Sequence, residues 1–260
     1  MNGVWDQELA ALDFETTGLS AEGGDRVIEV AVVRGRMGEV PRTWSTLVAP
    51  GRRVGATHIH GITEAMVAGQ PSFAAIAPTL LAMLGGAVMV AHNAPFDLSF
   101  LRMECRRAGM VAPEDPVIDT LGLSRRVLPL ASHSLASVCE ALSISRTRAH
   151  RAADDAAATL RIAWHLLDVA DPGRTLDVDG ARALCRRRTS AEQRIVMDAL
   201  LVARGHAQPI EIEYRNAGTP DGLLTRRAIT VYKVTTSKVE AFCHLRGEDR
   251  IFRLDRIRLV

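Results

Sequence analysis

Four carboxylates and one imidazole, in three distant segments of the chain, could together perform metal-dependent hydrolysis. Asp13 and Glu15 stand in ALDFETTGLS, Asp97 in AHNAPFDLSFL, and His150 and Asp155 in HRAADDAAATL. Carboxylate oxygens are the ligands that Mg²⁺ and other hard cations prefer, and an imidazole can exchange a proton near neutral pH. Divalent cations combined with such a base are suited to the hydrolysis of a phosphodiester.

The spacing of Asp13 and Glu15 brings their side chains to one face of an extended segment, because residues two apart in a strand point the same way. Adjacent carboxylates repel each other unless a cation lies between them, so a metal is their natural partner. Simpler roles are open as well. An Asp-x-Glu pair can be a solvated strand end, and Asp97, two residues after Pro95, can be an acid that the dipole of a helix stabilises.

His150 and Asp155 stand five residues apart near the start of a helix expected from about residue 151 to 169. Their side chains would therefore lie on neighbouring faces of that helix. Asp154 is a competing candidate for the metal from this pattern alone. The small side chains of AADDAAA would let the helix approach another element closely, as a crowded metal centre requires.

Apolar runs and helical periods predict a mixed α/β sheet with helices packed on it. Strands are expected at residues 8–14, 27–34, 43–49, 85–93 and 117–119, and helices at 72–84, 97–108, from about 134, and at 151–169. The fourth of these strands would end at His92 and Asn93.

A second, smaller domain is expected after the segment DPGRTLDVDG, which concentrates Pro, Gly and Asp at residues 171–180. A helix at 190–204 and four short alternating strands after it predict a small antiparallel barrel or sheet. We therefore expect domains at 1–170 and 189–260, joined by a linker at 171–188.

The net charge of +2 conceals two different halves of the chain. Residues 1–179 carry 16 Lys and Arg against 21 Asp and Glu, whereas residues 180–260 carry 16 against 9. An acidic half around a metal site, joined to a basic half, is typical of a nuclease with an auxiliary nucleic-acid-binding module. A basic surface can equally be only a soluble one.

The cysteines and the N-terminus indicate a cytoplasmic protein without a membrane partner. The four cysteines are far apart and form no CxxC pair, so neither a zinc knuckle nor a redox motif is indicated. We expect them to be small core residues in a reducing compartment. The N-terminus lacks a basic region followed by a long apolar run, and no segment approaches the ~20 apolar residues of a membrane span.

The three acidic motifs, DxET, HNAxFD and HxAxxDA, resemble those of the DnaQ-like 3′–5′ exonucleases of the DEDDh branch. The resemblance covers residues 8–168 and includes HGIT at 60–63 and DTL at 119–121. It implies a ribonuclease H-like sheet, two Mg²⁺ or Mn²⁺ ions, and removal of mononucleotides from a free 3′ end.

The resemblance also implies roles for single residues. Asp13, Glu15 and Asp155 would hold the first metal, Asp13 would bridge to a second that Asp97 approaches, and His150 would be the general base. The family's histidine stands five residues before its last aspartate, which selects Asp155 over Asp154. The positions matching the pocket for the terminal nucleotide, which could also be core, turn or loop residues, are Thr16, Leu19, His60, His92, Asn93 and Phe96.

The segment from residue 208 to the end resembles WYL domains, which are small Sm-like or SH3-like β-barrels of bacterial regulators and nucleic-acid-processing proteins. AFCHLRGEDRIFRLDRI carries the resemblance, although the Trp-Tyr-Leu tripeptide is absent. Arginines there could bind phosphates, or could form a solvated face with local partners such as Asp249 and Asp255. These arginines are Arg226, Arg227, Arg246, Arg250, Arg253 and Arg256.

Together these features predict a 3′–5′ exonuclease that acts on nucleic acid with a free 3′ end, with single-stranded DNA favoured. Two alternatives stay open: an exoribonuclease of similar chemistry, and a nucleic-acid-binding regulator whose WYL module senses a ligand. The acidic motifs do not separate DNA from RNA, because the shape of the pocket decides whether a 2′-hydroxyl is accepted.

Overall fold

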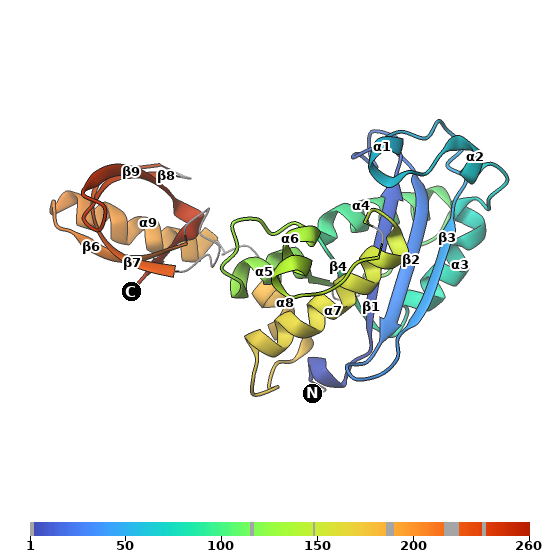
Figure 1. The fold of residues 1–260 in the computed structure, drawn as a ribbon, viewed down its shortest axis with the longest axis horizontal. Helices are drawn as coiled ribbons and strands as arrows, with labels where there is room; N and C mark the ends of the chain where they lie inside the picture. The colour runs from blue at the N-terminus through green and yellow to red at the C-terminus, as the bar shows by residue number, and fades with distance from the viewer. Residues whose placement is uncertain (1–2, 115–116, 148, 186–189, 216–223, 236–237) are drawn as a thin grey trace. The chain divides into compact units, whose positions relative to one another are not determined.

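The computed structural model describes the chain except residues 1–2, 115–116, 148, 186–189, 216–223 and 236–237 (Figure 1). The chain divides into two compact units. We call residues 1–127 and 133–185 the N-terminal unit, and residues 128–132 and 186–260 the C-terminal unit.

The N-terminal unit is built on a mixed five-stranded sheet in the order β3-β2-β1-β4-β5. β1 pairs antiparallel with β2, and β2 with β3, whereas β1, β4 and β5 run parallel. The predicted mixed sheet is therefore confirmed. Its strands are β1 (Leu9–Thr16), β2 (Val27–Gly35), β3 (Arg42–Leu47), β4 (Val88–Ala91) and β5 (Val117–Asp119).

Helices cover both faces of this sheet. α3 (Phe73–Leu84) and α4 (Ala94–Arg107) pack on one face, and α7 (Ala152–Ala170) runs along β1 and β2 on the other (Figure 1). The remaining elements of the unit are η1 (Val4–Asp6), α1 (Thr57–His60), α2 (Glu64–Val67), α5 (Thr120–Val127), α6 (Leu135–Ala141) and α8 (Val178–Cys185).

The alternation of side chains along β1 decides where the acids point. Leu12 and Phe14 pack into an apolar core with Phe73 and Phe100 of α3 and α4. Because successive strand residues face opposite sides, Asp13 and Glu15 lie on the face that α7 covers. The alanines of α7 allow its close approach to β1 and β2.

The predicted linker at 171–188 contains a helix, Val178–Cys185, where no regular element was expected. This helix, α8, packs against α5 and belongs to the N-terminal unit, which extends to Cys185. A Cβ atom on Gly122 of α5 would lie only 1.9 Å from the backbone oxygen of Cys185. The missing side chain of Gly122 is therefore what admits α8 at this distance. Residues 186–189 of the predicted linker lie outside the described residues.

The C-terminal unit contains an antiparallel sheet in the order β10-β6-β7-β8-β9, with α9 (Ser190–Gly205) packed on it. The antiparallel sheet is confirmed. A pairing of β9 with β10, which would close a barrel, is not found among the described residues. The barrel therefore stays a prediction. The strands are β6 (Ile210–Arg215), β7 (Leu224–Val234), β8 (Lys238–Cys243), β9 (Glu248–Arg253) and β10 (Ile257–Leu259).

The expectation of four strands in this unit was wrong for the last of them. RIFRLDRIRLV was read as one alternating strand, but a 3₁₀ turn, η2 (Leu254–Arg256), separates β9 from β10. Leu254, the first residue of this turn, and Ile257, directly after it, both enter the core of the unit. In the part of the chain that the structure describes, no helix is long and apolar enough to span a membrane.

Candidate active site

Asp97 reaches the end of β1 from the first turn of α4. Its Oδ1 accepts a hydrogen bond from the backbone N–H of Phe14 at 3.2 Å, and Phe14 stands between Asp13 and Glu15. Asp97 is only 4% exposed. The structure therefore brings Asp97 to the pair Asp13 and Glu15, which stand more than eighty residues earlier in the chain.

Asp119, at the end of β5, positions the start of α4. Asn93, the residue before this helix, has a left-handed backbone (φ 71°), and its own side chain makes no capping bond. The Oδ1 atom of Asp119 instead accepts the N–H groups of Asn93 at 2.9 Å and Ala94 at 3.3 Å. A carboxylate there satisfies unpaired N–H groups and complements the helix dipole, which steadies the turn that carries Asp97.

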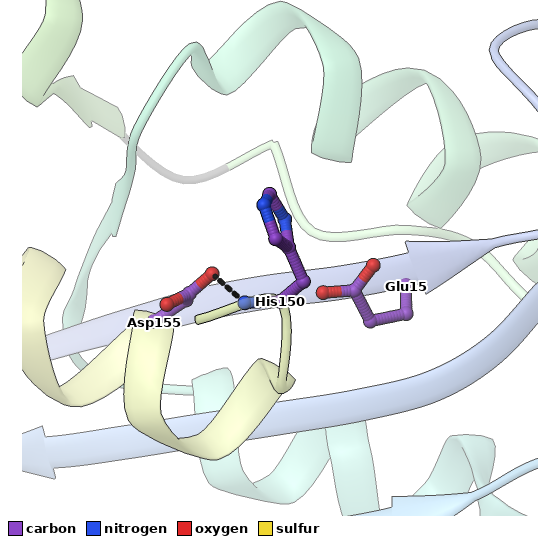
Figure 2. Close-up of side chains that lie close together, drawn as sticks. All are labelled: Glu15, His150 and Asp155. Carbon is purple, nitrogen blue, oxygen red and sulfur yellow. Dashed lines mark hydrogen bonds between the residues drawn. The ribbon is translucent and has the colours of Figure 1, made fainter. Parts of the chain in front are cut away.

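His150 and Asp155 join the acids of β1 from the start of α7. The backbone N–H of His150 donates to Oδ2 of Asp155 at 3.2 Å, as Figure 2 shows. One potential ligand atom from each of Glu15, His150 and Asp155 lies within 4.8 Å of the others. His150 is exposed, whereas Asp155 is buried. This group includes Asp155 and not Asp154, as the resemblance implied.

The acids oppose one another's ionisation. Burial raises the pKa of Asp13 well above its usual range, and the charges of Asp97, Asp155 and Glu15 add to the effect. Burial, followed by the charges of Asp155 and Glu29, raises the pKa of Glu15 to about 7. Burial likewise raises the pKa of Asp97 to about 8, against the opposing effect of the Phe14 hydrogen bond.

The donor set fits a divalent cation. Burial raises the pKa of Asp155 as well, although the guanidinium of Arg146 opposes this. Arg146 Nη1 lies 3.1 Å from Asp155 Oδ1, yet among the described residues this buried oxygen accepts no hydrogen bond. Asp13, Glu15 and Asp155 would hold such a cation, with Asp97 beside them, because a positive charge would relieve their repulsion.

The raised pKa values predict how stability depends on pH without metal. In its folded form Glu15 releases its proton near pH 7 and Asp97 near pH 8, whereas the usual values are 4.5 and 3.8. The folded state thus binds more protons than the unfolded state between about pH 4 and 8, so stability falls as pH rises through this window.

In a chelating buffer we therefore expect the unfolding temperature at pH 8 to be about 5 °C lower than at pH 5.5. Adding Mn²⁺ at pH 8 should recover most of the loss, which calorimetry would measure. Two results would contradict a metal site at these acids. One is an unfolding temperature in chelator that rises from pH 5.5 to pH 8, and the other is an unfolding temperature at pH 8 that Mn²⁺ does not change.

His60 and His92, both predicted to line the substrate pocket, use their ring nitrogens within the protein. His60 is buried; its Nε2 bonds Gly55 O at 2.9 Å, and its Nδ1 accepts the N–H of Ile62 at 3.0 Å. His92 bonds Thr120 Oγ1 through Nδ1 and His133 O through Nε2. Burial lowers the pKa of both imidazoles, so neutral rings are favoured. Substrate contact by these rings stays a prediction.

The other predicted pocket residues lie at the same end of the sheet or at the start of α4. Leu19, just beyond β1, is 86% exposed. Phe96 is half-buried against Phe100. Thr16 donates its hydroxyl hydrogen to Gly18 O, as a turn residue would, and Asn93 is exposed. Leu19 and Asn93 are therefore the most accessible to a substrate.

The arginines of the C-terminal unit do not form one group. Arg227 is 3% exposed, bonds Thr225 Oγ1 through Nε, and lies over the ring of Tyr214. Because this guanidinium packs inside the unit, we no longer expect Arg227 to contact a phosphate. Arg256 is half-buried. The exposed members are Arg226, Arg246, Arg250 and Arg253.

The structure reveals one more buried acid near the site. Glu29 of β2 is paired directly with Glu15 across the sheet and is 4% exposed. Its signal in the sequence is a lone acid within the apolar run VIEVAVV, where a charge is costly without a partner. The apolar pattern of this run predicts a strand but not a role for its acid.

Comparison with known proteins identifies the class of this fold and site. Residues 10–163 match the RNase_T exonuclease family. The chain is 38% identical over 159 residues to DNA polymerase III PolC-type of Thermotoga maritima, covering 60% of this chain and 12% of the relative. It is 34% identical over 165 residues to 3′-5′ exonuclease DinG of Bacillus subtilis, covering 62% of this chain and 18% of that protein.

A solved structure of Exonuclease X in complex with 5′ overhanging duplex DNA is also similar. It has 26% sequence identity and a TM-score of 0.55, and the alignment covers 68% of this chain and 99% of that one. The predicted ribonuclease H-like fold of the N-terminal unit is thus confirmed.

The chain belongs to the exonuclease family. Its N-terminal unit is an exonuclease domain that is similar to 3′-5′ exonuclease DinG and to Exonuclease X, and the family uses divalent metals. The chain matches only 12% and 18% of the length of the two curated relatives described above. The family match ends at residue 163, so the resemblance of the C-terminal unit to WYL domains stays a prediction.

Proposed function

We propose that the protein is a 3′–5′ exonuclease that releases nucleoside monophosphates from the 3′ end of single-stranded DNA, with two Mg²⁺ or Mn²⁺ ions. One observation carries the proposal. Asp13, Glu15, Asp97 and Asp155 converge from β1, α4 and α7, and the exposed His150 lies beside them. Acids that repel one another in this way need a cation to be ionised together.

Different residues of the chain would bind the cations and transfer the proton. Divalent cations, when bound, would supply positive charge for the attacking and leaving oxygens of the phosphodiester. Asp13, Glu15 and Asp155 would hold them, and Asp97 would complete the cluster. His150 accepts the proton of the attacking water on a ring nitrogen, because its imidazole is exposed to solvent next to the acids. The backbone bond from His150 to Asp155 keeps the base beside the ligands.

Leu19, Asn93 and Phe96 would provide the contact for the terminal nucleotide. An apolar side chain that is 86% exposed at the end of β1 can pack against a base. Such a contact does not depend on sequence, because every base offers an apolar face. The enzyme would therefore shorten strands of any sequence.

DNA is proposed over RNA because the similar proteins named above are a DNA polymerase III, an exonuclease and Exonuclease X bound to DNA. A role in DNA repair or nucleic-acid processing follows from this substrate. The C-terminal unit, which we propose to be of the WYL type, would bind the strand through its phosphates. The exposed arginines of β9 support this, although Arg250 lies 3.3 Å from Glu248 and is partly compensated.

Neutralising two exposed arginines of β9 should weaken binding of single-stranded DNA and flatten its dependence on salt. For Arg250→Gln/Arg253→Gln we expect the slope of log K against log salt to fall in magnitude by about 1.4. Arg102→Gln/Arg161→Gln, which removes two exposed charges from the N-terminal unit, is the matched control. Fluorescence anisotropy with a labelled oligonucleotide measures both. Equal slopes for the two variants would exclude this role for β9.

Digestion of 3′-labelled single- and double-stranded DNA and RNA tests the proposed function. We expect Mg²⁺ or Mn²⁺ to support release of labelled mononucleotide, fastest from single-stranded DNA, and chelator to stop it. Preference for RNA would replace the proposed substrate by an exoribonuclease substrate. Binding without any digestion would favour the nucleic-acid-binding regulator.

A further inference from the structure

Glu29 is a buried acid beside the metal cluster that the proposed mechanism does not use. It stands opposite Glu15 in the pairing of β1 with β2, and its side chain is 6% exposed. Its charge contributes to the raised pKa values of Asp13 and Glu15. A carboxylate in this place makes it harder to ionise Asp13 and Glu15. Its presence therefore suggests that Glu29 has another role.

Among the described residues, the hydrogen bonds of the Glu29 side chain lead to the start of α7. Arg151 approaches it with two guanidinium nitrogens: Nη2 donates to Oε1 at 2.7 Å, and Nε lies 3.1 Å from Oε1 and 3.2 Å from Oε2. The backbone N–H of Ala152, the first residue of the helix, donates to Oε2 at 3.0 Å. Glu29 therefore takes the place of a capping side chain, because Arg151 makes no side-chain cap bond of its own.

This junction is where the catalytic residues of the third motif are held. His150 immediately precedes Arg151 and has a left-handed backbone (φ 59°), which a histidine adopts at some cost. Asp155 follows one helical turn after the capped N–H. The orientation of both side chains toward Glu15 thus depends on the direction in which α7 leaves the sheet.

We propose that Glu29 is a positioning residue: it clamps the start of α7 to β2 and holds the positive charge of Arg151 away from the metal ligands. The inference rests on the proposed metal-dependent function of the same site. Without the carboxylate, the guanidinium of Arg151 has no partner on β2. It then competes with a cation for Glu15, whose ionised form it already favours.

Mn²⁺ binding to the full-length protein, measured by isothermal titration calorimetry, tests the proposal without substrate. Glu29→Gln keeps the shape of the side chain and removes its charge, and should raise the dissociation constant about tenfold. A second change, Arg151→Gln, removes the unpaired cation and should restore part of that loss. At saturating metal and DNA, kcat should fall in Glu29→Gln while KM stays near the wild-type value.

Glu8→Gln is the matched control. Glu8 pairs with Arg34 and Arg42 away from the cluster, so its loss should leave Mn²⁺ affinity within about twofold of wild type. Glu29→Asp keeps the charge, but its shorter side chain cannot reach both Arg151 and the N–H of Ala152. If Glu29→Gln does not fold, Glu29→Asp is measured in its place. We expect a severalfold loss of Mn²⁺ affinity in Glu29→Asp.

Unchanged Mn²⁺ affinity in a folded Glu29 variant overturns the proposal, even if its unfolding temperature falls, because Glu29 would then only stabilise the fold. The two inferences can fail separately. A wild-type protein that binds Mn²⁺ but releases no nucleotide refutes the exonuclease function alone. Efficient digestion, combined with Mn²⁺ affinity that is insensitive to Glu29, refutes only the role of Glu29.

Discussion

Asp13→Asn is expected to abolish nucleotide release while leaving the protein folded. The charges of Asp97, Asp155 and Glu15 all act on Asp13, and the substitution removes a proposed ligand of the metal from among them. Because metal charge supplies several kcal/mol of transition-state stabilisation, the rate should fall at least about a thousandfold. The measurement is the initial rate of mononucleotide release from a 3′-labelled single strand in Mg²⁺.

The same substitution should stabilise the metal-free protein. Asn keeps the shape of Asp and removes one of the mutually repelling charges, so the unfolding temperature in chelator at pH 8 should rise. Asp154→Asn is the control, since it removes the same kind of charge from the residue beside Asp155 and is not one of the four acids of the proposed site. Full activity of Asp13→Asn, or equal losses in the two variants, would contradict the assignment.

His150→Asn should remove most of the rate without removing metal. Asn tolerates the left-handed backbone of residue 150, and the bond to Asp155 comes from the backbone N–H, which the substitution retains. A general base contributes about 10²- to 10⁴-fold, so kcat should fall by that factor. Calorimetric titration should give the wild-type affinity for Mn²⁺.

The exposed His165 on the same helix provides the control, and His165→Asn should keep the wild-type rate. A large loss of Mn²⁺ affinity in His150→Asn would instead make His150 a ligand. The geometry would allow His150 to be a ligand, because a ring nitrogen of His150 lies within 4.8 Å of potential ligand atoms of Glu15 and Asp155.

The sequence predicted the placement of the acidic side chains well where the local periodicity and the spacing of these residues coincide. The two-residue spacing of Asp13 and Glu15 indicated a common strand face, and the structure places both on β1 facing α7. The choice of Asp155 over Asp154 came from the family spacing and agrees with the observed group of potential ligands. Convergence with Asp97 could not be derived from periodicity, because it depends on how α4 meets the end of β1.

Residues whose roles arise from tertiary contacts were missed or misread. Glu29 looked like an ordinary strand residue, and its cap of α7 comes from a segment more than 120 residues away. Arg227 looked like a phosphate ligand, but strand alternation and the ring of Tyr214 bury it. The 3₁₀ turn at residues 254–256 interrupts a pattern that alternation alone reads as one strand.

Digestion of one oligonucleotide, labelled at either end, tests the central claim most directly. With Mg²⁺ or Mn²⁺, the account predicts that a 3′ label is released first as a mononucleotide and that 5′-labelled strands shorten stepwise from the other end. Chelator, or Asp13→Asn, should abolish both patterns. Internal fragments, release from the 5′ end, or full activity in chelator would contradict an exonuclease that holds divalent metal on these four acids.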